Sequence, residues 1–270
     1  MIRSIVNLTV CFALISWALM SQAQRVPQQA GPESTTCLYN FNSGTNNTFL
    51  NFCVTATGNI MEIETPKGHE QLIANFGTDG YGICNESPAT VYFDYGITDG
   101  DSGNWGSPTL LNQTATSVKI ARTTSDGIWT LTQTITLVPA TPAIKIAMAL
   151  KNNTAAPRKA YLIRWADINA DFSLPNDFSA TRNTAAGWTA SLPFSSTFGF
   201  GLQLQNSGNS QFGFVDGFSR TTFHGPNPCN FAANSSGTPL VNVDGSIALA
   251  YVEAIGANKS KTATMLYRGM

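Results

Sequence analysis

The sequence is poor in charge. Of its 270 residues only 11% are charged, and 15 Lys and Arg against 16 Asp and Glu give a net charge of −1. A protein that holds nucleic acid or an anionic membrane surface needs a field of positive charge, so this composition excludes both kinds of partner. Asn, Thr, Ser and Gly fill the polar positions, which is typical of exported proteins rich in strands and turns.

Catalytic motifs are scarce as well. The sequence contains two histidines and no nucleophile elbow, phosphate-binding glycine loop or cysteine–histidine dyad in a useful context. A glycosidase would need two carboxylates about 5 to 10 Å apart across a cleft. With 16 acidic residues, some pair at that distance is expected by chance. The lack of a recognisable catalytic set favours a non-catalytic protein.

Long apolar runs are confined to the first two dozen residues. Arg3 precedes an apolar run over Ile5–Met20, and Ser21-Gln22-Ala23 follows it. This is the order of a secretory signal peptide cleaved after Ala23. The run is interrupted by polar residues and is shorter than the ~20 apolar residues of a spanning helix. We therefore expect a signal peptide over 1–23, a flexible mature N-terminus over 24–35, and a secreted or periplasmic protein without membrane insertion of the mature chain.

Four cysteines remain after this cleavage: Cys37, Cys53, Cys84 and Cys229. Their spacing contains no CxxC, which argues against a zinc site, and export favours disulfides. Residues 36–41 and 49–54 predict two strands around a turn, with Cys37 and Cys53 equidistant from Thr45. Opposed positions in a hairpin have the separation that a disulfide needs. We expect Cys37 to pair with Cys53, which leaves Cys84 for Cys229.

The mature chain reads as strand after strand. In 128–137, Trp129, Leu131 and Ile135 alternate with threonines, the pattern of a half-buried strand, and an Asp-Gly turn separates this segment from a strand over 117–122. Further strands are expected over 143–151, 159–165, 246–253 and 260–268. The segment 159–165 is apolar on both faces, which predicts a central strand. The first four should form a meander and the last two a closing pair. The pattern predicts an all-β fold with few or no helices, one large antiparallel β-sandwich domain over 36–270.

Several short motifs support a family resemblance. They are Gly58-Asn59-Ile60 leading into Thr65-Pro66-Lys67-Gly68-His69-Glu70, then Gly80-Tyr81-Gly82-Ile83-Cys84, Arg122-Thr123-Thr124-Ser125-Asp126-Gly127, Leu150-Lys151-Asn152-Asn153 and Arg164-Trp165-Ala166-Asp167. With them the chain resembles secreted bacterial proteins that have the large sandwich of galactose-mutarotase-like and glycosidase N-terminal domains. The resemblance implies an architecture and a carbohydrate context, and no particular activity.

A catalytic site of the mutarotase type would use two histidines and a carboxylate. In this chain it would require His69, His224 and an acid such as Glu70 or Asp216. The competing interpretation makes His69 a turn residue and His224 part of a loop held by a disulfide.

An acidic, glycine-rich segment over 94–106 is a candidate ligand-binding loop. Tyr95 and Trp105 could stack on a sugar ring while Asp94 accepts hydrogen bonds from its hydroxyls. Tyr81 and Trp188 are further candidates of this kind, each with core packing as its alternative. A plain solvated loop explains the segment equally well.

A second acidic segment resembles the start of a calcium loop. Asp167, Asn169, Asp171 and Asp177 place oxygen donors at intervals that suit a hard cation. The segment departs from the EF-hand because Phe172 stands where the turn glycine belongs and no Glu closes the loop. The alternative is that these side chains cap turns by bonding their own backbone. The pattern requires no cofactor, and calcium is the one candidate.

Taken together, the residues favour an exported, non-catalytic β-sandwich that binds an extracellular glycan or serves as an extracellular structural module. The alternative is a carbohydrate-active enzyme of the mutarotase-like sandwich class. The sequence leaves the oligomeric state open.

Overall fold

The computed structural model describes residues 36–72, 79–96, 100–139, 141–173, 175–189, 201–207, 213–218, 227–232 and 239–270, without the side chains of 213–218, 231 and 232. The predicted signal peptide and mature N-terminus lie outside the described residues. Within these ranges no helix has the length and apolar character needed to cross a membrane.

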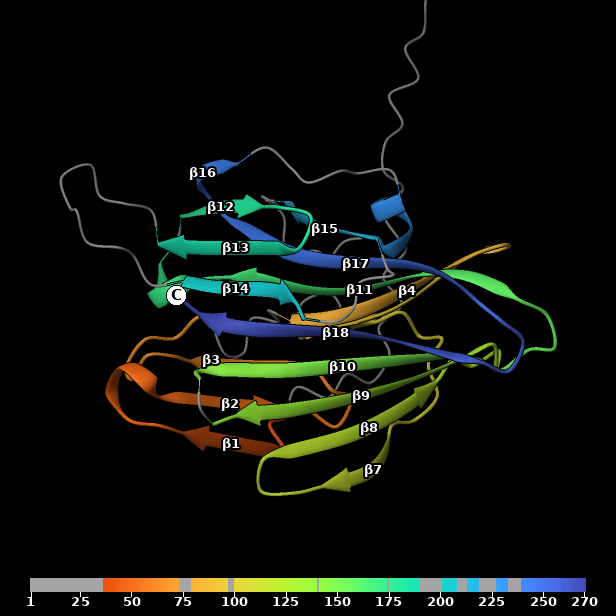
Figure 1. Cartoon of the computed structure of the whole chain (residues 1–270), viewed down its shortest axis with the longest axis horizontal. Helices are drawn as coiled ribbons and strands as arrows, with labels where there is room; N and C mark the ends of the chain where they lie inside the picture. The colour runs from red at the N-terminus through yellow and green to blue at the C-terminus, as the bar shows by residue number, and fades with distance from the viewer. Residues whose placement is uncertain are drawn as a thin grey trace, which may run out of the picture.

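The largest element is a nine-stranded antiparallel sheet (Figure 1). Its order is β16-β12-β13-β14-β18-β10-β9-β8-β7. The strands are β7 (Thr109–Gln113), β8 (Ser117–Thr123), β9 (Trp129–Val138), β10 (Ala143–Asn152), β12 (Asn176–Ala180), β13 (Thr184–Thr189), β14 (Gly201–Asn206), β16 (Leu240–Val243) and β18 (Ser260–Gly269).

Two smaller antiparallel sheets pack against it. The six-stranded sheet has the order β15-β17-β11-β4-β5-β6 and the three-stranded sheet the order β1-β2-β3. Their strands are β1 (Tyr39–Ser43), β2 (Leu50–Val54), β3 (Ile60–Glu64), β4 (Asp79–Glu86), β5 (Ala89–Tyr95), β6 (Gly100–Asp101), β11 (Arg158–Ile168), β15 (Gly213–Phe218) and β17 (Gly245–Ile255). Three short 3₁₀ helices complete the described elements: η1 (Asn46–Thr48), η2 (Ala170–Phe172) and η3 (Pro228–Ala232).

The core lies between these sheets. Strands β12, β13, β14 and β18 contact β15 or β17, and β9 contacts β1, so the nine-stranded sheet covers both smaller ones. On β9 the buried positions alternate as expected, with Trp129, Leu131 and Ile135 in the core. The prediction of an all-β antiparallel sandwich is confirmed.

Two details of the predicted topology are wrong. Strands β8, β9 and β10 form the expected meander, but β11 leaves it and enters the six-stranded sheet. Strands β17 and β18 are consecutive in sequence yet belong to different sheets. The reason is burial: β11 and β17 are buried on both faces and pair with each other inside the six-stranded sheet, whereas β10 alternates and pairs with β9 and β18.

Both predicted disulfide pairings are confirmed. Cys37 is joined to Cys53 and Cys84 to Cys229, with Cα–Cα distances of 5.4 and 5.0 Å. The expected hairpin register is wrong, however, because Cys53 lies opposite Asn40 and Cys37 precedes β1. The intervening loop contains η1, whose extra turn shifts the strands. Two disulfides suit an oxidising compartment outside the cytosol.

Candidate functional site

The predicted sugar-binding segment over 94–106, which the structure describes without 97–99, turns its acidic and aromatic side chains away from solvent. Asp94, the last residue but one of β5, has no exposed surface, Tyr95 and Tyr81 are also buried, and Trp105 is 9% exposed. The Trp105 indole nitrogen donates to the Phe93 carbonyl at 3.1 Å. The expectation of a solvated loop is therefore corrected. Asp94, Tyr81 and Trp105 point into the space between the sheets, whereas Tyr95 packs against Phe93 and Trp165 on the other face of the six-stranded sheet.

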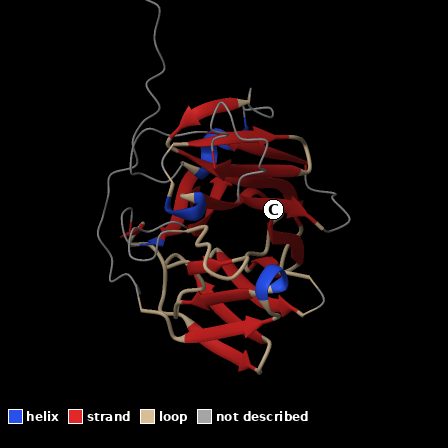
Figure 2. Ribbon diagram, turned by 90° about the vertical axis from the view of Figure 1, so that its left-hand side faces the viewer, coloured by secondary structure: helices blue, strands red, loops and turns tan. Residues whose placement is uncertain are grey.

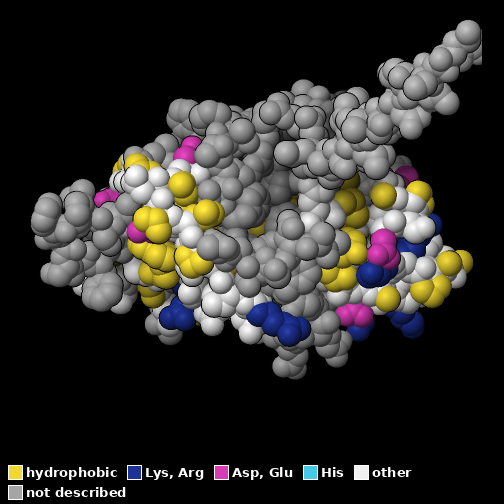
Figure 3. Space-filling model, turned by 90° about the horizontal axis from the view of Figure 1, so that it is seen from above, with side chains coloured by type: hydrophobic (Ala, Val, Ile, Leu, Met, Phe, Trp, Pro, Cys, Tyr) yellow, Lys and Arg dark blue, Asp and Glu magenta, His cyan; other side chains and the backbone are white. Residues whose placement is uncertain are grey.

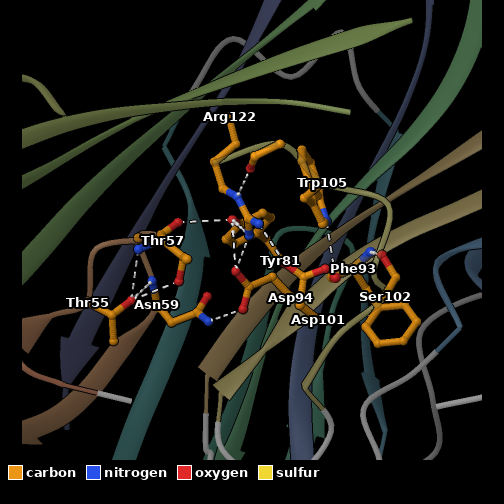
Figure 4. A network of polar contacts seen from close by, with 12 residues as sticks. Thr55, Thr57, Asn59, Tyr81, Phe93, Asp94, Asp101, Ser102, Trp105 and Arg122 are labelled. Atoms are coloured by element: carbon orange, nitrogen blue, oxygen red, sulfur yellow. Dashed lines mark hydrogen bonds and ion pairs between the residues drawn. The ribbon is translucent and has the colours of Figure 1, made fainter. Parts of the chain in front are cut away.

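The acidic groups of this segment surround one arginine (Figure 4). Arg122, on β8 of the nine-stranded sheet, forms ion pairs with Asp94 and with Asp101, each at 2.5 Å, both on the six-stranded sheet. Its Nε donates to the Gly106 carbonyl at 3.2 Å, and its guanidinium lies 5.2 Å from the centroid of the Trp105 ring. The cluster joins the two sheets.

A second buried arginine repeats this arrangement. Arg164, on β11, donates from Nε to Oδ1 of Asp79 at 2.9 Å and pairs with it again through Nη2. Asp79 also accepts from the Tyr267 hydroxyl at 2.7 Å, and Arg164 donates to Gln133 Oε1 at 2.7 Å. Tyr267 and Gln133 lie on the nine-stranded sheet, so this cluster also connects the two large sheets.

The turn between β2 and β3 brings the third sheet into contact with both clusters. The Thr57 carbonyl accepts from the Tyr81 hydroxyl at 2.9 Å, and the Gly58 carbonyl accepts from Arg164 at 3.3 Å. Gly58 has a φ of +93°, and a Cβ there would lie 2.5 Å from Nε2 of Gln133. We call the clusters of Arg122 and Arg164, with this turn, the inter-sheet network. The buried charges of this network are tolerated because they are paired and hydrogen-bonded. The network therefore holds the sheets together.

The structure brings other predicted residues together at one end of the sandwich. His69 lies in the loop after β3 and Asp171 in η2, 102 residues later, and His69 Nδ1 is 2.8 Å from Asp171 Oδ1. The side chains are 30% and 37% exposed. Figure 2 looks onto this end, which also carries the C-terminus. Gly269 lies there against Thr65, because a Cβ on Gly269 would be 2.8 Å from that side chain.

The backbone holds this end firmly. The loop after β3 closes on itself, with the Thr65 N–H donating to the His69 carbonyl at 2.9 Å. Helix η2 joins it, since the Asp171 N–H donates to the Glu70 carbonyl at 2.6 Å. Asp171 and Phe172 both have a φ of 56°, which is unusual for non-glycine residues and especially for a bulky one. Phe172 is 64% exposed. We call Lys67, His69, Asp171 and Phe172 the His69 end.

Glu70 lies beside the His69 end but faces inward. Its Oε1 accepts from the Ile63 N–H at 2.8 Å and from the Leu72 N–H at 3.1 Å. Burial raises the pKa of Glu70 to about 7, although these two donors lower it. Glu70 forms an antiparallel bridge with Glu64, and neighbouring side chains of an extended segment point to opposite faces. His69 and Glu70 therefore do not share one face.

The predicted calcium donors are divided among different partners. Asp171 contacts His69, and Asp177 Oδ1 accepts from the Asn242 N–H at 2.8 Å. Asn169 is buried at the start of η2, and Asp167 lies on β11 opposite Ser246. In the described part of the chain no three His, Cys, Asp or Glu side chains gather as metal ligands would. The calcium site stays a prediction.

Two candidates remain to be placed. Trp188 lies on β13 opposite Asp177 and is partly exposed, and its role in ligand binding also stays a prediction. His224 lies outside the described residues, as does the side chain of Asp216. The described residues therefore do not test whether His69 and His224 form a two-histidine site.

Sequence reasoning missed the two buried arginines, although a signal was present. Arg122 follows Val118 and Ile120 at the inward positions of β8. Arg164 stands between Leu162 and Ala166 on β11. A lone arginine at a core position of a strand requires a buried acid, and this requirement could have drawn attention to Asp79 and Asp101.

Comparisons with known proteins show the fold. No protein-family model matches the sequence, and no curated protein matches it. Among solved structures, a bacterial glucoamylase complexed with acarbose is 10% identical to this chain, with a TM-score of 0.52. The alignment covers 91% of this chain and 34% of the glucoamylase chain. The chain thus spans about a third of that protein.

Two epimerase-like structures match over most of their own length. A C. elegans homologue of GalM and aldose epimerase is 7% identical with a TM-score of 0.49, covering 86% of this chain and 98% of that one. A galactose mutarotase related enzyme from Lactobacillus acidophilus is 7% identical, with a TM-score of 0.44. That alignment covers 86% of this chain and 97% of the enzyme. At such identities a likeness concerns the fold alone, and the glucoamylase match confirms the predicted resemblance as one of fold.

Proposed function

We propose that this protein is an exported, non-catalytic β-sandwich that binds an extracellular carbohydrate at the His69 end. The observation that carries the proposal is the pair of left-handed residues Asp171 and Phe172. Asp171 places a partly exposed carboxylate against His69, and Phe172, the next residue, presents an exposed aromatic ring. A glycine or asparagine would make this turn at lower cost. Costly backbone conformations of bulky residues cluster at sites that hold ligands.

The chemistry of the His69 end suits a sugar. An aromatic face stacks on the apolar face of a pyranose ring, while a carboxylate and an imidazole hydrogen-bond its hydroxyls. Four segments distant in sequence supply this end: η1, the loop after β3, η2 and the C-terminal strand, as the Lys67 N–H bonded to the Asn46 carbonyl and the Gly269 contact with Thr65 illustrate. A site made of rigid, mutually bonded segments binds without large ordering costs.

Charge favours a neutral ligand. The net charge is −1, and on the described part of the face in Figure 3 basic and acidic side chains are few and interspersed. Lys67 and Asp171 place one charge of each sign at the His69 end. An uncharged glycan is the partner that this surface fits, rather than nucleic acid or a strongly anionic polymer.

Binding rather than turnover is supported by the way the carboxylates are used. Asp79, Asp94 and Asp101 are held in buried ion pairs of the inter-sheet network. Glu70 has the pKa of a general acid, but its Oε1 accepts two backbone N–H bonds and the side chain faces away from His69. A second carboxylate beside His69 and Asp171 would be needed for glycoside hydrolysis.

The test is a glycan array, followed by calorimetry with the best neutral ligand. Phe172→Ala should weaken binding about fivefold or more, since ring stacking contributes roughly 1 kcal/mol. Asp171→Asn keeps a residue that tolerates the left-handed backbone and should also weaken binding. Val241→Ala, at a 70% exposed apolar residue on β16, is the matched control. Unchanged affinity in Phe172→Ala and Asp171→Asn would refute the site.

The alternative, a carbohydrate-active enzyme, draws on one observation. Glu70, with its pKa raised to about 7 by burial, is adjacent in sequence to the His69–Asp171 pair. If this group transferred protons, catalytic interconversion of aldose anomers would be abolished by Glu70→Gln while sugar binding persisted. Absence of turnover by the intact protein, with binding retained, would eliminate this alternative.

A further inference from the structure

Strand β7 forms one edge of the nine-stranded sheet (Figure 1). It pairs with β8 on one side, and all five of its residues are exposed. Two of them are large and apolar: Leu110 is 48% and Leu111 51% exposed. An edge strand of a sandwich normally buries one of its faces, so the exposure of both leucines on β7 calls for an explanation.

This edge lacks most of the features that prevent strands of different molecules from pairing. The segment Thr109–Gln113 contains no charged residue and no proline, and the first charge after it is Lys119 on β8. No residue of β7 has a positive φ. One irregularity is present, a register shift between Leu110 and Asn112 that leaves Leu111 as the extra residue. Edge strands usually carry lysines, prolines or inward charges that discourage such pairing.

Other described edges are less suited to accept a strand. On β16, Asn242 has a left-handed φ of 59° and its N–H is taken by Asp177. Strand β6 has two residues, and Asp101 in it is bound to Arg122. Strand β1 is also an uncharged edge, but its Phe41 is buried and its exposed residues, Asn40 and Asn42, are polar. Compared with these edges, β7 is the uncharged one that exposes large apolar side chains.

We propose that two copies of this chain associate through β7, with the two strands antiparallel about a two-fold axis. A pairing centred on Leu111 sets Leu111 of one copy opposite Leu111 of the other, and Leu110 opposite Asn112. Such an interface is isologous, so the association closes at a dimer and does not continue into a filament. The two nine-stranded sheets (9 + 9) become one continuous sheet of 18 strands.

Three properties select a second copy as the occupant. The strand is uncharged, so two copies meet without like-charge repulsion. Antiparallel pairing satisfies the free backbone N–H and C=O groups that an edge leaves open. Leucines on both sides lose apolar surface to water in the same contact. A five-residue strand makes a small interface, so the dimer should dissociate on dilution. The dimer is independent of carbohydrate binding.

Sedimentation equilibrium of the full mature protein over a hundredfold range of concentration tests the proposal. We expect a monomer–dimer equilibrium whose mass approaches twice that of the chain. Leu111→Lys places two like charges face to face and should raise the dissociation constant at least tenfold. Val241→Lys, at an exposed apolar residue on the opposite edge, should leave it unchanged. Far-ultraviolet circular dichroism and melting temperatures verify that both variants fold.

A cross-linking variant tests the register. Directly opposed residues of antiparallel strands have Cα atoms about 4.5–5.5 Å apart, within the range of a disulfide. Leu111→Cys should therefore form a covalent dimer on mild oxidation, and Val241→Cys should not. A monomer at every concentration, a dimer insensitive to Leu111→Lys, or cross-linking through Val241→Cys in place of Leu111→Cys would overturn the proposal.

Discussion

Replacing Arg164, one of the two buried arginines of the inter-sheet network, should destabilise the protein severely. Arg164 and Asp79 are both completely buried. Arg164→Met keeps most of the apolar volume but leaves the Asp79 carboxylate with the Tyr267 hydroxyl and the Ile60 N–H as its donors. The Gly58 carbonyl loses its arginine donors as well. Removing one partner of a buried ion pair costs about 3–5 kcal/mol, so we expect a loss of that size in the free energy of unfolding.

The assay is equilibrium unfolding in urea, followed by tryptophan fluorescence with the disulfides intact. The matched control is Arg268→Met, because Arg268 is exposed and donates to Gln205 at the surface. Exposed substitutions of this kind change stability by about 0.5 kcal/mol or less. Both variants replace an arginine by methionine. The difference between their losses in the free energy of unfolding therefore measures the effect of burying the guanidinium group.

A double variant separates the ion pair from general damage to the core. Asp79→Asn removes the charge that Arg164→Met would leave uncompensated. The double variant should therefore lose about 1–3 kcal/mol less than the sum of the single losses. The reasoning is refuted if Arg164→Met lowers the free energy of unfolding by less than about 1 kcal/mol with an unchanged denaturant slope. It is also refuted if the loss in the double variant equals the sum of the losses in the two single variants.

Three further outcomes are expected. Because burial raises the pKa of Glu70 from 4.5 to about 7, the native state holds this proton more tightly than the unfolded chain, and the free energy of unfolding should fall by roughly 3 kcal/mol as pH rises from about 4 to 8. Glu70→Gln should flatten that dependence in unfolding curves measured at each pH. Gly58→Ala combines a positive φ with a contact of 2.5 Å to Gln133 and should cost about 2–3 kcal/mol, against about 1 kcal/mol for Gly127→Ala, where a Cβ meets nothing within 4 Å. Loss of the Cys84–Cys229 disulfide, whose cysteines are 145 residues apart, should lower stability by about 2 kcal/mol more than loss of the disulfide spanning 16 residues. Equal losses in the two disulfide variants, measured by thermal unfolding, would contradict the loop-entropy argument.

Much of the fold could be predicted because its signals are local. The alternation on β9, the Asp-Gly turn before it and the double-sided apolar pattern of β11 each depend on neighbouring residues. The disulfide partners also followed from sequence, although the register between Cys37 and Cys53 did not. A register depends on where the connecting loop is centred. The loop over 44–49, which contains η1, is centred on residues 46 and 47 and not on Thr45.

The candidate site was harder to predict because the same residue types serve the core and the surface. Asp94 and Trp105 looked like a sugar-binding loop, yet both turn inward to meet Arg122 on another strand. His69 and Asp171 were each singled out, but for separate purposes, as a catalytic residue and a calcium ligand. Their contact spans 102 residues, and no local pattern predicts a pairing over that distance.

The amino-acid sequence by itself determined the all-β class of this protein, through period-2 strands, low charge and an even set of cysteines in the predicted mature chain. Its first residues also predict a leader for export. Those properties act through composition and near neighbours. The tertiary structure decided which polar groups remain available to a ligand. It buries Asp94 and Asp101 against Arg122 and leaves His69, Asp171 and Phe172 partly or largely exposed. The physical reason is that a buried charge needs a partner, and only the packing of the three sheets determines which charges become buried.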